Sequence, residues 1–310
     1  CWPDRCLPAA LFRFPWKAYF ISRLYSSRYC DFLRRCTDLY SPDYKDERTG
    51  IEMLVDIKHL NFSYSGTQEI LSDINLSIEA GCFLGILGQN GAGKSTLLKC
   101  INTLHAATSG DVFLDGKNIN EMSLREIAQK VSYVPQSTLS QFPTTVMNLV
   151  LLGRLPYSGY SFTNKDRKHA MHAMQEMGLE KYMMSDICHL SGGERQRAFI
   201  ARALAGSPQI ILMDEPTSSL DVHHQLEVLA RIRGLVRKSN IAVVMVIHDL
   251  NMAAMFCDRL VLLKDAKIYK DGSPNQVLTE ESINEIYHVR SFTMDRFGKR
   301  YIQLLDPDMY

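Results

Sequence analysis

The stretch Gly88–Thr96, which reads GQNGAGKST, constrains the fold more than any other part of the chain. It fits the pattern G-x-x-x-x-G-K-[ST], and the apolar run CFLGIL comes directly before it. In a strand–loop–helix segment of this kind, the glycines of the loop let backbone N–H groups turn toward phosphate oxygens. The N-terminus of the helix adds a positive partial charge. The stretch therefore predicts a phosphate-binding loop in a parallel α/β sheet.

Two side chains of this loop are expected to act on a bound nucleotide directly. Lys94 should reach the β- and γ-phosphates, and the Ser95 hydroxyl should bind Mg²⁺. The rest of the loop is expected to complete the site through Gly88, Asn90, Gly91, Gly93 and Thr96. A purely structural glycine turn is the alternative, and it is disfavoured because the whole pattern and its flanking strand rarely coincide by chance.

Two other apolar runs end in polar residues that suit the same chemistry. IILMDEP carries Asp214 and Glu215 at its end, and VVMVIHD carries His248. Runs of this kind are typical of central parallel strands, whose carboxyl ends form the ligand-binding edge of open α/β sheets. Asp214 is expected to hold Mg²⁺, directly or through water, Glu215 to polarise a water for attack on the γ-phosphate, and His248 to contact that phosphate. Solvent-facing carboxylates and a structural histidine are the alternatives.

Gln136 follows the strand-like segment VSYV and is the remaining candidate at this edge. Its amide could sense both the metal and the attacking water, where the chain enters a helical segment. An ordinary surface amide is the alternative, and the residues around Gln136 favour neither.

The remaining patterns divide the chain into three regions. Residues 53–275 alternate strand and helix patterns: LVDIKHLNFSY and VFLDGKNI predict antiparallel strands, and a helical insert spans about 137–190. Residues 276–310 are expected to pack on this part as a tail. Residues 1–52 are aromatic and basic, and ordinary alternation begins only at Met53. We therefore expect residues 1–52 to be an upstream translation artefact or a dispensable extension.

Apolar spacing in the helical insert also predicts which side chains are buried. Leu149 and Leu152 should point inward with Met147, whereas Arg154 should be solvated. A later helix should bury one apolar face, made of Ala170, Met174 and Met177. SLREIAQ should begin with a capping box formed by Ser123 and Glu126.

Metal binding by cysteine or histidine is disfavoured. The early cysteines form no CxxC pair; they are Cys1, Cys6, Cys30 and Cys36. Four later cysteines lie singly among apolar neighbours and are expected to be small core residues in a reducing compartment; they are Cys82, Cys100, Cys188 and Cys257. His223 and His224 are expected to begin a helix with solvated imidazoles.

Charge and hydropathy narrow the range of partners. The formal net charge of +1 gives no reason to expect a nucleic-acid partner. The longest uncharged run, Val131 to Gly153, is broken by prolines and polar residues, so it does not predict a transmembrane helix. If the protein acts at a membrane, another chain has to span it.

A second glycine-rich helix start, LSGGERQ at 190–196, leads to a family. The phosphate loop, Gln136, LSGGERQ, IILMDEP, SSLD (218–221) and His248 resemble an ABC-type ATP-binding cassette in order and spacing, over about 54–275. The resemblance implies a P-loop NTPase (RecA-like) fold, with an antiparallel β subdomain at its start and a helical insert. It also implies ATP hydrolysis with Mg²⁺ and a head-to-tail dimer. In that dimer, Ser191, Gly192 and Gly193 of one copy face the γ-phosphate held by the other.

The resemblance adds further residue roles. Tyr64 matches the aromatic residue that stacks on adenine, and Asp221 matches the loop that contacts the second copy. Gln136 matches the lid glutamine, which is expected to bind Mg²⁺, Glu215 matches the catalytic base, and His248 matches the switch histidine. Gln89 stands where many relatives have proline, and its side chain need not touch phosphate.

The segment FPTTVMNLVLLGRLPY is similar to cassettes that serve importers of iron-siderophore, haem and cobalamin. That similarity implies two transmembrane permease subunits, an indirect substrate-binding protein, and a peripheral location on the cytoplasmic face of the membrane. Zinc or manganese importers and exporter-type cassettes are alternatives. A soluble ABC ATPase is a further alternative, but that class usually carries two cassettes or a long coiled coil, and this sequence shows neither.

Overall fold

Two β-sheets organise the part of the chain that the computed structural model describes, which comprises residues 53–64, 68–136, 143–159, 161–218, 220–296 and 298–305. The larger sheet has the strand order β10-β9-β3-β8-β7-β6. Its strands are β3 (Phe83–Gly88), β6 (Val131–Val134), β7 (Ile210–Asp214), β8 (Ala242–Val246), β9 (Arg259–Lys264) and β10 (Lys267–Gly272). Neighbours run parallel except for the edge strand β10, which is antiparallel to β9. The predicted parallel core is therefore confirmed.

The smaller sheet is antiparallel, in the order β2-β1-β4-β5. Its strands are β1 (Met53–Ser63), β2 (Glu69–Glu79), β4 (Ser109–Leu114) and β5 (Lys117–Asn118). Positive φ at Asp115 and Gly116 forms the two-residue turn between β4 and β5. One apolar core contains side chains from both sheets and from the helix that follows the phosphate loop, so the two sheets and this helix pack as one body.

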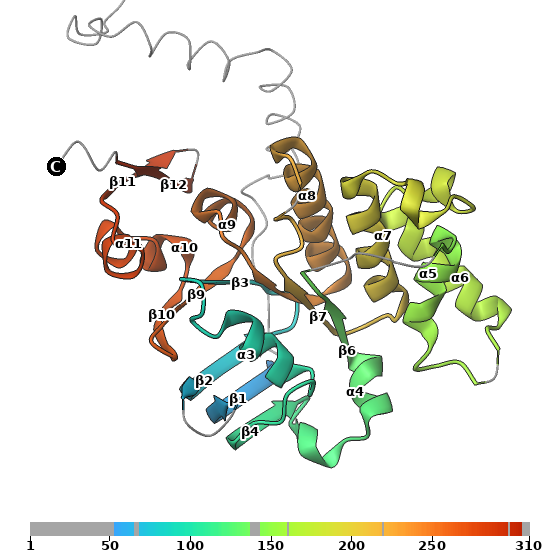
Figure 1. Cartoon of the computed structure of the whole chain (residues 1–310), viewed down its shortest axis with the longest axis horizontal. Coiled ribbons are helices and arrows are strands. Elements are labelled where there is room, and N and C mark those ends of the chain that lie inside the picture. Colours follow the sequence, from blue (N-terminus) through green and yellow to red (C-terminus); the bar gives the residue numbers. More distant parts are fainter. Residues whose placement is uncertain are drawn as a thin grey trace, which may run out of the picture. The chain divides into compact units, whose positions relative to one another are not determined.

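Helices cover the large sheet and extend beyond it (Figure 1). The α-helices before the tail are α3 (Lys94–Ile101), α4 (Leu124–Lys130), α5 (Val146–Leu151), α6 (Asn164–Glu176), α7 (Gly192–Ala205), α8 (Val222–Ser239) and α9 (Leu250–Phe256). Short 3₁₀ turns lie at Ile119–Glu121, Leu152–Arg154, Glu180–Tyr182 and Ile187–His189. Helix α7 packs against α5 and α6, so the helical layer between β6 and β7 continues past residue 190.

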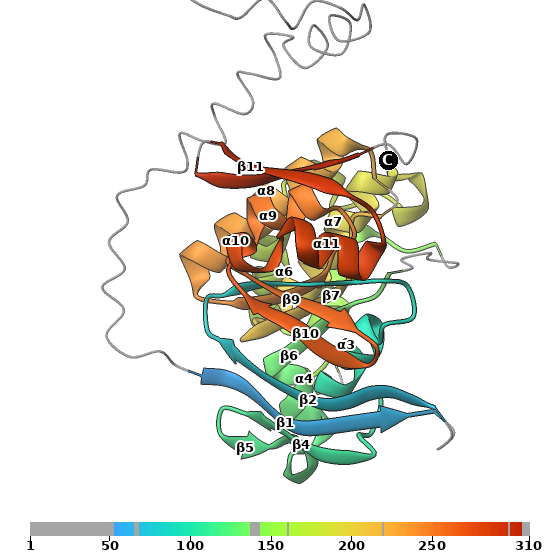
Figure 2. The same ribbon diagram turned by 90° about the vertical axis from the view of Figure 1, so that its left-hand side faces the viewer.

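The tail consists of two short helices and a hairpin, α10 (Pro274–Val277), α11 (Glu280–Tyr287), β11 (Ser291–Arg296) and β12 (Lys299–Leu304). Helix α10 packs against β9 and β10 (Figure 2), and β12 packs against α9. The tail therefore lies beside the half of the large sheet that carries the phosphate loop.

The predicted burial of the helical layer is partly wrong. Leu149 is buried as expected, but Leu152 is 45% exposed and Arg154 only 4% exposed. The buried face of α5 carries Val146 and Val150, and with about 3.6 residues per turn Leu152 lies on the opposite side of the axis, whereas Arg154 continues the buried face. There, Arg154 Nε donates to Asp166 Oδ1 at 3.0 Å.

Other packing predictions can be compared with the structure directly. The face made of Ala170, Met174 and Met177 is buried, and the capping box of Ser123 and Glu126 is present. Three of the later cysteines are buried, but Cys188 is exposed because it lies in a single 3₁₀ turn, capped by Asp186, on the surface of the helical layer. The early cysteines and the prediction for residues 1–52 fall outside the described residues.

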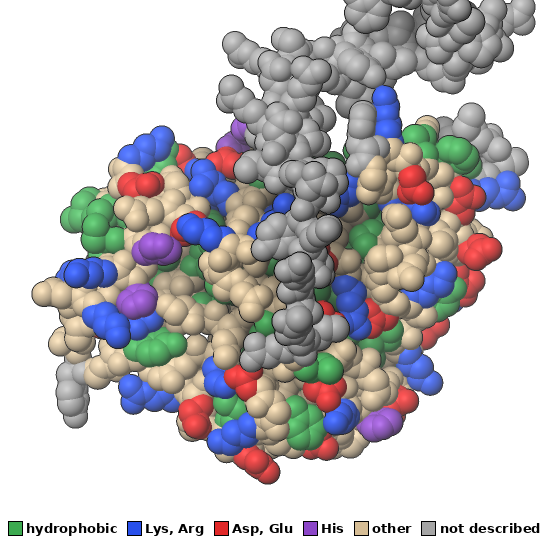
Figure 3. Space-filling model, turned by 180° about the vertical axis from the view of Figure 1, so that it is seen from behind, with side chains coloured by type: hydrophobic (Ala, Val, Ile, Leu, Met, Phe, Trp, Pro, Cys, Tyr) green, Lys and Arg blue, Asp and Glu red, His purple; other side chains and the backbone are tan. Residues whose placement is uncertain are grey.

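The surface of the described residues carries mixed charge. On the face seen in Figure 3, Lys and Arg side chains are interspersed with Asp and Glu, as the net charge of +1 leads one to expect. Within the ranges given above, no helix combines the length and the apolar character that crossing a membrane requires.

Candidate nucleotide-binding and catalytic site

The phosphate loop connects β3 to α3 and encloses a buried lysine. Gly93 caps α3 with φ +94°, and a Cβ there would lie 2.6 Å from the Ile70 carbonyl oxygen, so only glycine fits. Lys94 Nζ donates to the carbonyl oxygens of Gly88 at 2.9 Å and Gln89 at 2.7 Å. Burial lowers the pKa of Lys94. The loop thus holds an ammonium group out of water, next to exposed backbone where phosphate can bind.

Asp214 and Ser95 form an oxygen pair at the start of α3. Ser95 Oγ donates to Asp214 Oδ1 at 2.8 Å, and the Tyr133 hydroxyl donates to Asp214 Oδ2 at 3.3 Å. Burial and the Asp214 carboxylate raise the pKa of Tyr133 well above its usual value. A buried carboxylate beside a hydroxyl suits Mg²⁺, which prefers hard oxygen ligands, so these residues fit that ion. Sequence analysis missed Tyr133, whose only signal is its place in VSYV, beside the run that carries Asp214.

Glu215 is held between two side chains from neighbouring strand ends. Gln136 Nε2 donates to Glu215 Oε2 at 2.7 Å, and His248 Nε2 lies 2.5 Å from Glu215 Oε1. The Glu215 backbone has φ +47°, a conformation that is rare outside glycine and is concentrated at functional sites. The structure therefore brings together three of the predicted residues, which follow β6, β7 and β8.

The charges at this edge also act on the phosphate loop. The carboxylates of Glu215 and Asp214 raise the pKa of Lys94 and so oppose part of the effect of burial. The lysine and the two carboxylates therefore share one electrostatic environment, as a site for a nucleotide and its cation requires.

Tyr64 lies at the other end of the phosphate loop. Its hydroxyl is 3.4 Å from Thr96 Oγ1 and 3.3 Å from His105 Nε2, and its ring meets the His105 ring edge-on at 5.3 Å between centroids. Tyr64 is 61% exposed, which leaves its ring accessible to a base. The loop residues Asn90 and Gly91 are also exposed.

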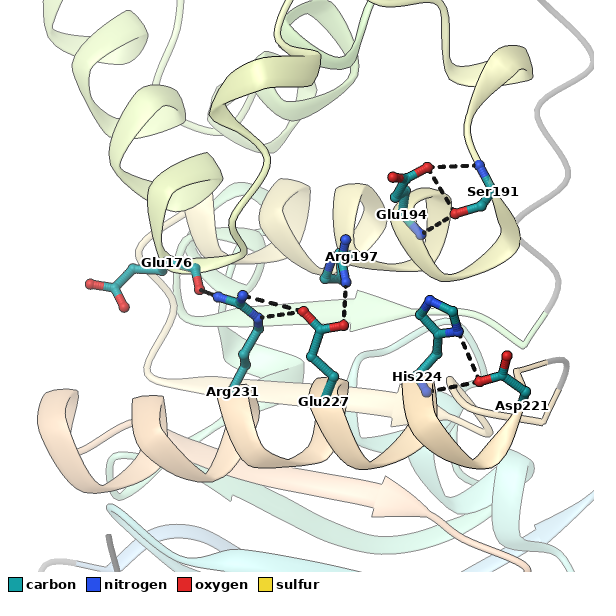
Figure 4. Close-up of polar contacts among 8 residues, drawn as sticks. All are labelled: Glu176, Ser191, Glu194, Arg197, Asp221, His224, Glu227 and Arg231. Carbon is teal, nitrogen blue, oxygen red and sulfur yellow. Dashed lines mark hydrogen bonds and ion pairs between the residues drawn. The ribbon is translucent and has the colours of Figure 1, made fainter. Parts of the chain in front are cut away.

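The second glycine-rich turn begins α7 (Figure 4). The Ser191 hydroxyl and the Glu194 carboxylate form a capping box, with Ser191 Oγ donating to Glu194 Oε2 at 2.8 Å. Hydrogen bonds from Tyr182 and then Ser191 lower the pKa of Glu194 to about 2. Gly192 is exposed. Within the described ranges, no hydrogen bond or ion pair joins Ser191 to the phosphate loop of the same chain.

Asp221 and His224 face this turn from the start of α8. Asp221 Oδ1 accepts from the His224 backbone N–H at 2.9 Å and lies 2.8 Å from His224 Nδ1. A Cβ on Gly193 would lie 2.9 Å from His224 Cδ2, so the imidazole packs against the turn. The His224 side chain is 37% exposed, so its imidazole is only partly solvated, with one edge against the turn. His223 is exposed as expected.

Ionic contacts tie α7 to α8 behind the turn (Figure 4). Arg197 Nη1 donates to Glu227 Oε2 at 2.8 Å, and Arg231 Nη2 donates to Glu227 Oε1 at 3.3 Å. Arg231 Nη1 also donates to the Glu176 carbonyl oxygen at 3.1 Å. The turn is therefore built on helices that are fixed to each other.

Comparison with known proteins gives consistent similarities. Residues 71–218 match the family described as ABC transporter. A cobalamin import ATP-binding protein of Halobacterium salinarum is 39% identical over 238 residues, which are 77% of this chain and 60% of that relative. The chain thus spans less than two thirds of the length of this relative. An uncharacterized ABC transporter ATP-binding protein of Methanocaldococcus jannaschii is 39% identical, over 77% of this chain and 93% of that protein. A petrobactin import ATP-binding protein of Bacillus anthracis is 36% identical, over 77% of this chain and 88% of that protein.

Solved structures agree with these relatives. A chain of an inward-facing metal-chelate type ABC transporter aligns with this chain with a TM-score of 0.73 at 27% identity. The alignment covers 84% of this chain and 100% of that chain. The dimeric structure of a bacterial ABC transporter cassette aligns with a TM-score of 0.64 at 31% identity, over 71% of this chain and 99% of that chain. With its P-loop NTPase fold and the motifs described above, the chain belongs to the family of ABC transporter ATP-binding proteins.

Proposed function

We propose that this chain is the ATP-hydrolysing subunit of an ABC importer whose cargo is a metal chelate of the iron-siderophore, haem or cobalamin class. The observation that carries the proposal is the meeting of the buried Lys94, the Ser95–Asp214 pair and the Gln136–Glu215–His248 group at the carboxyl ends of neighbouring strands. The cargo class is supported by relatives named for cobalamin and petrobactin import.

In the proposed mechanism, the phosphate loop binds the triphosphate. Lys94 leaves the two loop carbonyls for the β- and γ-phosphates, while the N–H groups at the start of α3 face the same oxygens. Ser95, Asp214 and Gln136 would hold Mg²⁺, which neutralises phosphate charge when bound. Tyr64 stacks on adenine with its exposed ring.

Glu215 then acts as the general base. Its carboxylate orients a water and accepts a proton as the water oxygen attacks the γ-phosphorus and the bond to ADP breaks. This requires Gln136 and His248 to release at least one carboxylate oxygen. Once released, His248 is free to contact the γ-phosphate, and Gln136 to contact the metal and the attacking water.

The second glycine-rich turn completes the site of another copy. Ser191, Gly192 and Gly193 offer a hydroxyl, backbone N–H groups and the N-terminus of α7 to the γ-phosphate held by the partner. Asp221 lies in the adjoining contact between copies. ATP thus closes a head-to-tail dimer and hydrolysis reopens it. The dimer passes this motion through the helical layer to two permease subunits at the cytoplasmic face of the membrane, which a substrate-binding protein supplies.

A mixing experiment tests the shared site. Gly192→Asp should leave ATP affinity within about twofold, because a Cβ on Gly192 meets only Leu220 Cδ2 at 3.8 Å. Hydrolysis should fall about 100-fold, because the added carboxylate repels the γ-phosphate of the partner. Mixed in equal amounts with Lys94→Ala, which disables only its own loop, about a quarter of wild-type ATPase activity should return, since half the dimers carry one intact site of two.

The matched control mixes Lys94→Ala with Glu215→Gln. Both changes lie in the same half of the site, so every heterodimer lacks an intact site and activity should stay at the level of the separate mutants. Equal activity in the two mixtures would contradict a site shared between copies.

A further inference from the structure

We infer that the C-terminal tail, residues 274–305, sets the affinity of the phosphate loop for nucleotide through Tyr287 and Gln89, which act as positioning residues. This rests on the proposed function, because it concerns the loop that is proposed to bind ATP. The argument comes from two contacts between the end of α11 and the junction of β3 with the loop.

The first contact holds the backbone of Gly88. Its N–H donates to the Tyr287 hydroxyl at 3.2 Å. Gly88 is the last residue of β3, where it pairs with Leu263 of β9, and the loop begins immediately after it. A buried N–H that loses its acceptor costs about as much as a lost hydrogen bond, so the tyrosine hydroxyl fixes the point where the loop leaves the sheet.

The second contact holds Gln89. Its Nε2 donates to the carbonyl oxygen of Ile286, in the last turn of α11, where carbonyl groups have no partner within the helix. The contact is made by the side-chain amide of Gln89, so a side chain without a donor at this position would lose it.

Lys94 holds the same two residues from within the loop. Its ammonium group donates to the carbonyl oxygens of Gly88 and Gln89, whereas the tail holds the N–H of one and the side chain of the other. When Lys94 moves to the phosphates, it releases both carbonyls. The tail contacts then keep the loop in its binding conformation.

The surroundings add to the importance of these contacts. A cavity of about 510 Å³ lies along the outer side of the loop, lined by Gln89, Asn90, Gly91, Ile286 and His288 among others. The two contacts described above bridge from the loop to α11 beside this open space. The tail is itself anchored, because Lys264 of β9 pairs with Glu285 of α11.

The far end of the tail reaches the segment that follows His248. Asn251 Nδ2 donates to the Ile302 carbonyl oxygen at 3.0 Å, and the Ile302 N–H donates to Asn251 Oδ1 at 2.8 Å. Asn251 lies in the first turn of α9, directly after the strand end that carries His248. The tail is thus attached to the protein on both sides of the site, so a shift of the tail would displace the phosphate loop.

The test uses Tyr287→Phe, Gln89→Met and the double variant in the full chain. Each substitution keeps the side-chain size and removes one hydrogen-bonding group. The dissociation constant for ATP should rise about fivefold for each variant and more for the double, as expected for one lost hydrogen bond apiece. The loss should appear in KM more than in kcat. Tyr301→Phe is the control, since it removes a tyrosine hydroxyl from strand β12 of the same tail and should leave the dissociation constant unchanged.

Two outcomes would overturn the inference. If Tyr287→Phe and Gln89→Met lower the thermal midpoint but bind ATP as the wild type does, the tail is merely fastened to the loop, and the proposed function stands. If the wild type itself does not bind ATP, the proposed function fails first. A rise in the dissociation constant for ATP in the two loop-contacting variants and not in Tyr301→Phe is the expected result, whether or not their thermal midpoints fall.

Discussion

Glu215→Gln should reduce ATP hydrolysis by about 10²- to 10⁴-fold, the usual contribution of a general base, while ATP still binds. Glutamine keeps the shape of the side chain and can still accept from Gln136, but it cannot take a proton from water. The nucleotide should therefore remain intact, and the dimer that it closes should accumulate. Phosphate release measures the first effect, and size-exclusion chromatography with Mg²⁺ and ATP measures the second.

Glu281→Gln is a suitable control, because Glu281 is an exposed glutamate of α11 and its change should leave both measurements as in the wild type. The assignment of Glu215 as the base fails if Glu215→Gln hydrolyses ATP at the normal rate. A variant that is inactive but stays monomeric with ATP bound would instead contradict the head-to-tail dimer.

The second large effect is expected on stability, at the buried ion pair of the helical layer. Arg154→Met should lower the free energy of unfolding by about 3–5 kcal/mol, because it leaves the buried Asp166 carboxylate without its cation. The Arg154 side chain is 5% exposed, and its Nη1 also donates to the Ala205 carbonyl oxygen at 3.0 Å. Denaturant unfolding at neutral pH measures the loss. The double variant Arg154→Met/Asp166→Asn should recover part of it, and a loss below about 1 kcal/mol in the single variant would contradict this view of the pair.

The same pair predicts a pH dependence. Hydrogen bonds from Thr163, followed by Arg154, lower the pKa of Asp166 to about 2, from an ordinary value of 3.8. A carboxyl group with a lowered pKa stabilises the fold above its unfolded value, so this contribution is complete above about pH 4 and is lost as the pH falls toward 2. In Arg154→Met, which lacks the cation, the folded-state pKa of Asp166 should lie closer to 3.8, so the free energy of unfolding should fall less between about pH 4 and pH 2 than in the wild type.

Much of the site follows from local sequence. Continuous apolar runs identify central strands, and the residue after each run must lie at the carboxyl edge of a parallel sheet. This is why Glu215 and His248 were predictable at the same edge of the sheet, whereas their contact depends on β7 and β8 being neighbours, which the runs alone do not show. The loop glycines were predictable for the same kind of reason, since Gly93 adopts a backbone conformation that other residues avoid.

Contacts between distant segments were not predictable in this way. Tyr287 lies 199 residues after Gly88, and nothing in the spacing of α11 indicates that its last turn meets the loop. The burial of Arg154 follows from which face of α5 is buried, the one that carries Val146 and Val150, and the apolar spacing of this segment did not distinguish that face from the one that carries Leu152. His224 looked like one of two surface histidines until the cap of α8 placed its ring against the second glycine-rich turn.

The contacts of Glu215 have a consequence for energy use in the cell. With both carboxylate oxygens engaged by Gln136 and His248, the base has to be freed before any water can be activated. An isolated subunit would therefore turn over slowly even in millimolar nucleotide, and events that separate these side chains would set its basal rate. If Glu215 is the base, as proposed, its contacts with Gln136 and His248 would restrain the consumption of ATP in the absence of cargo.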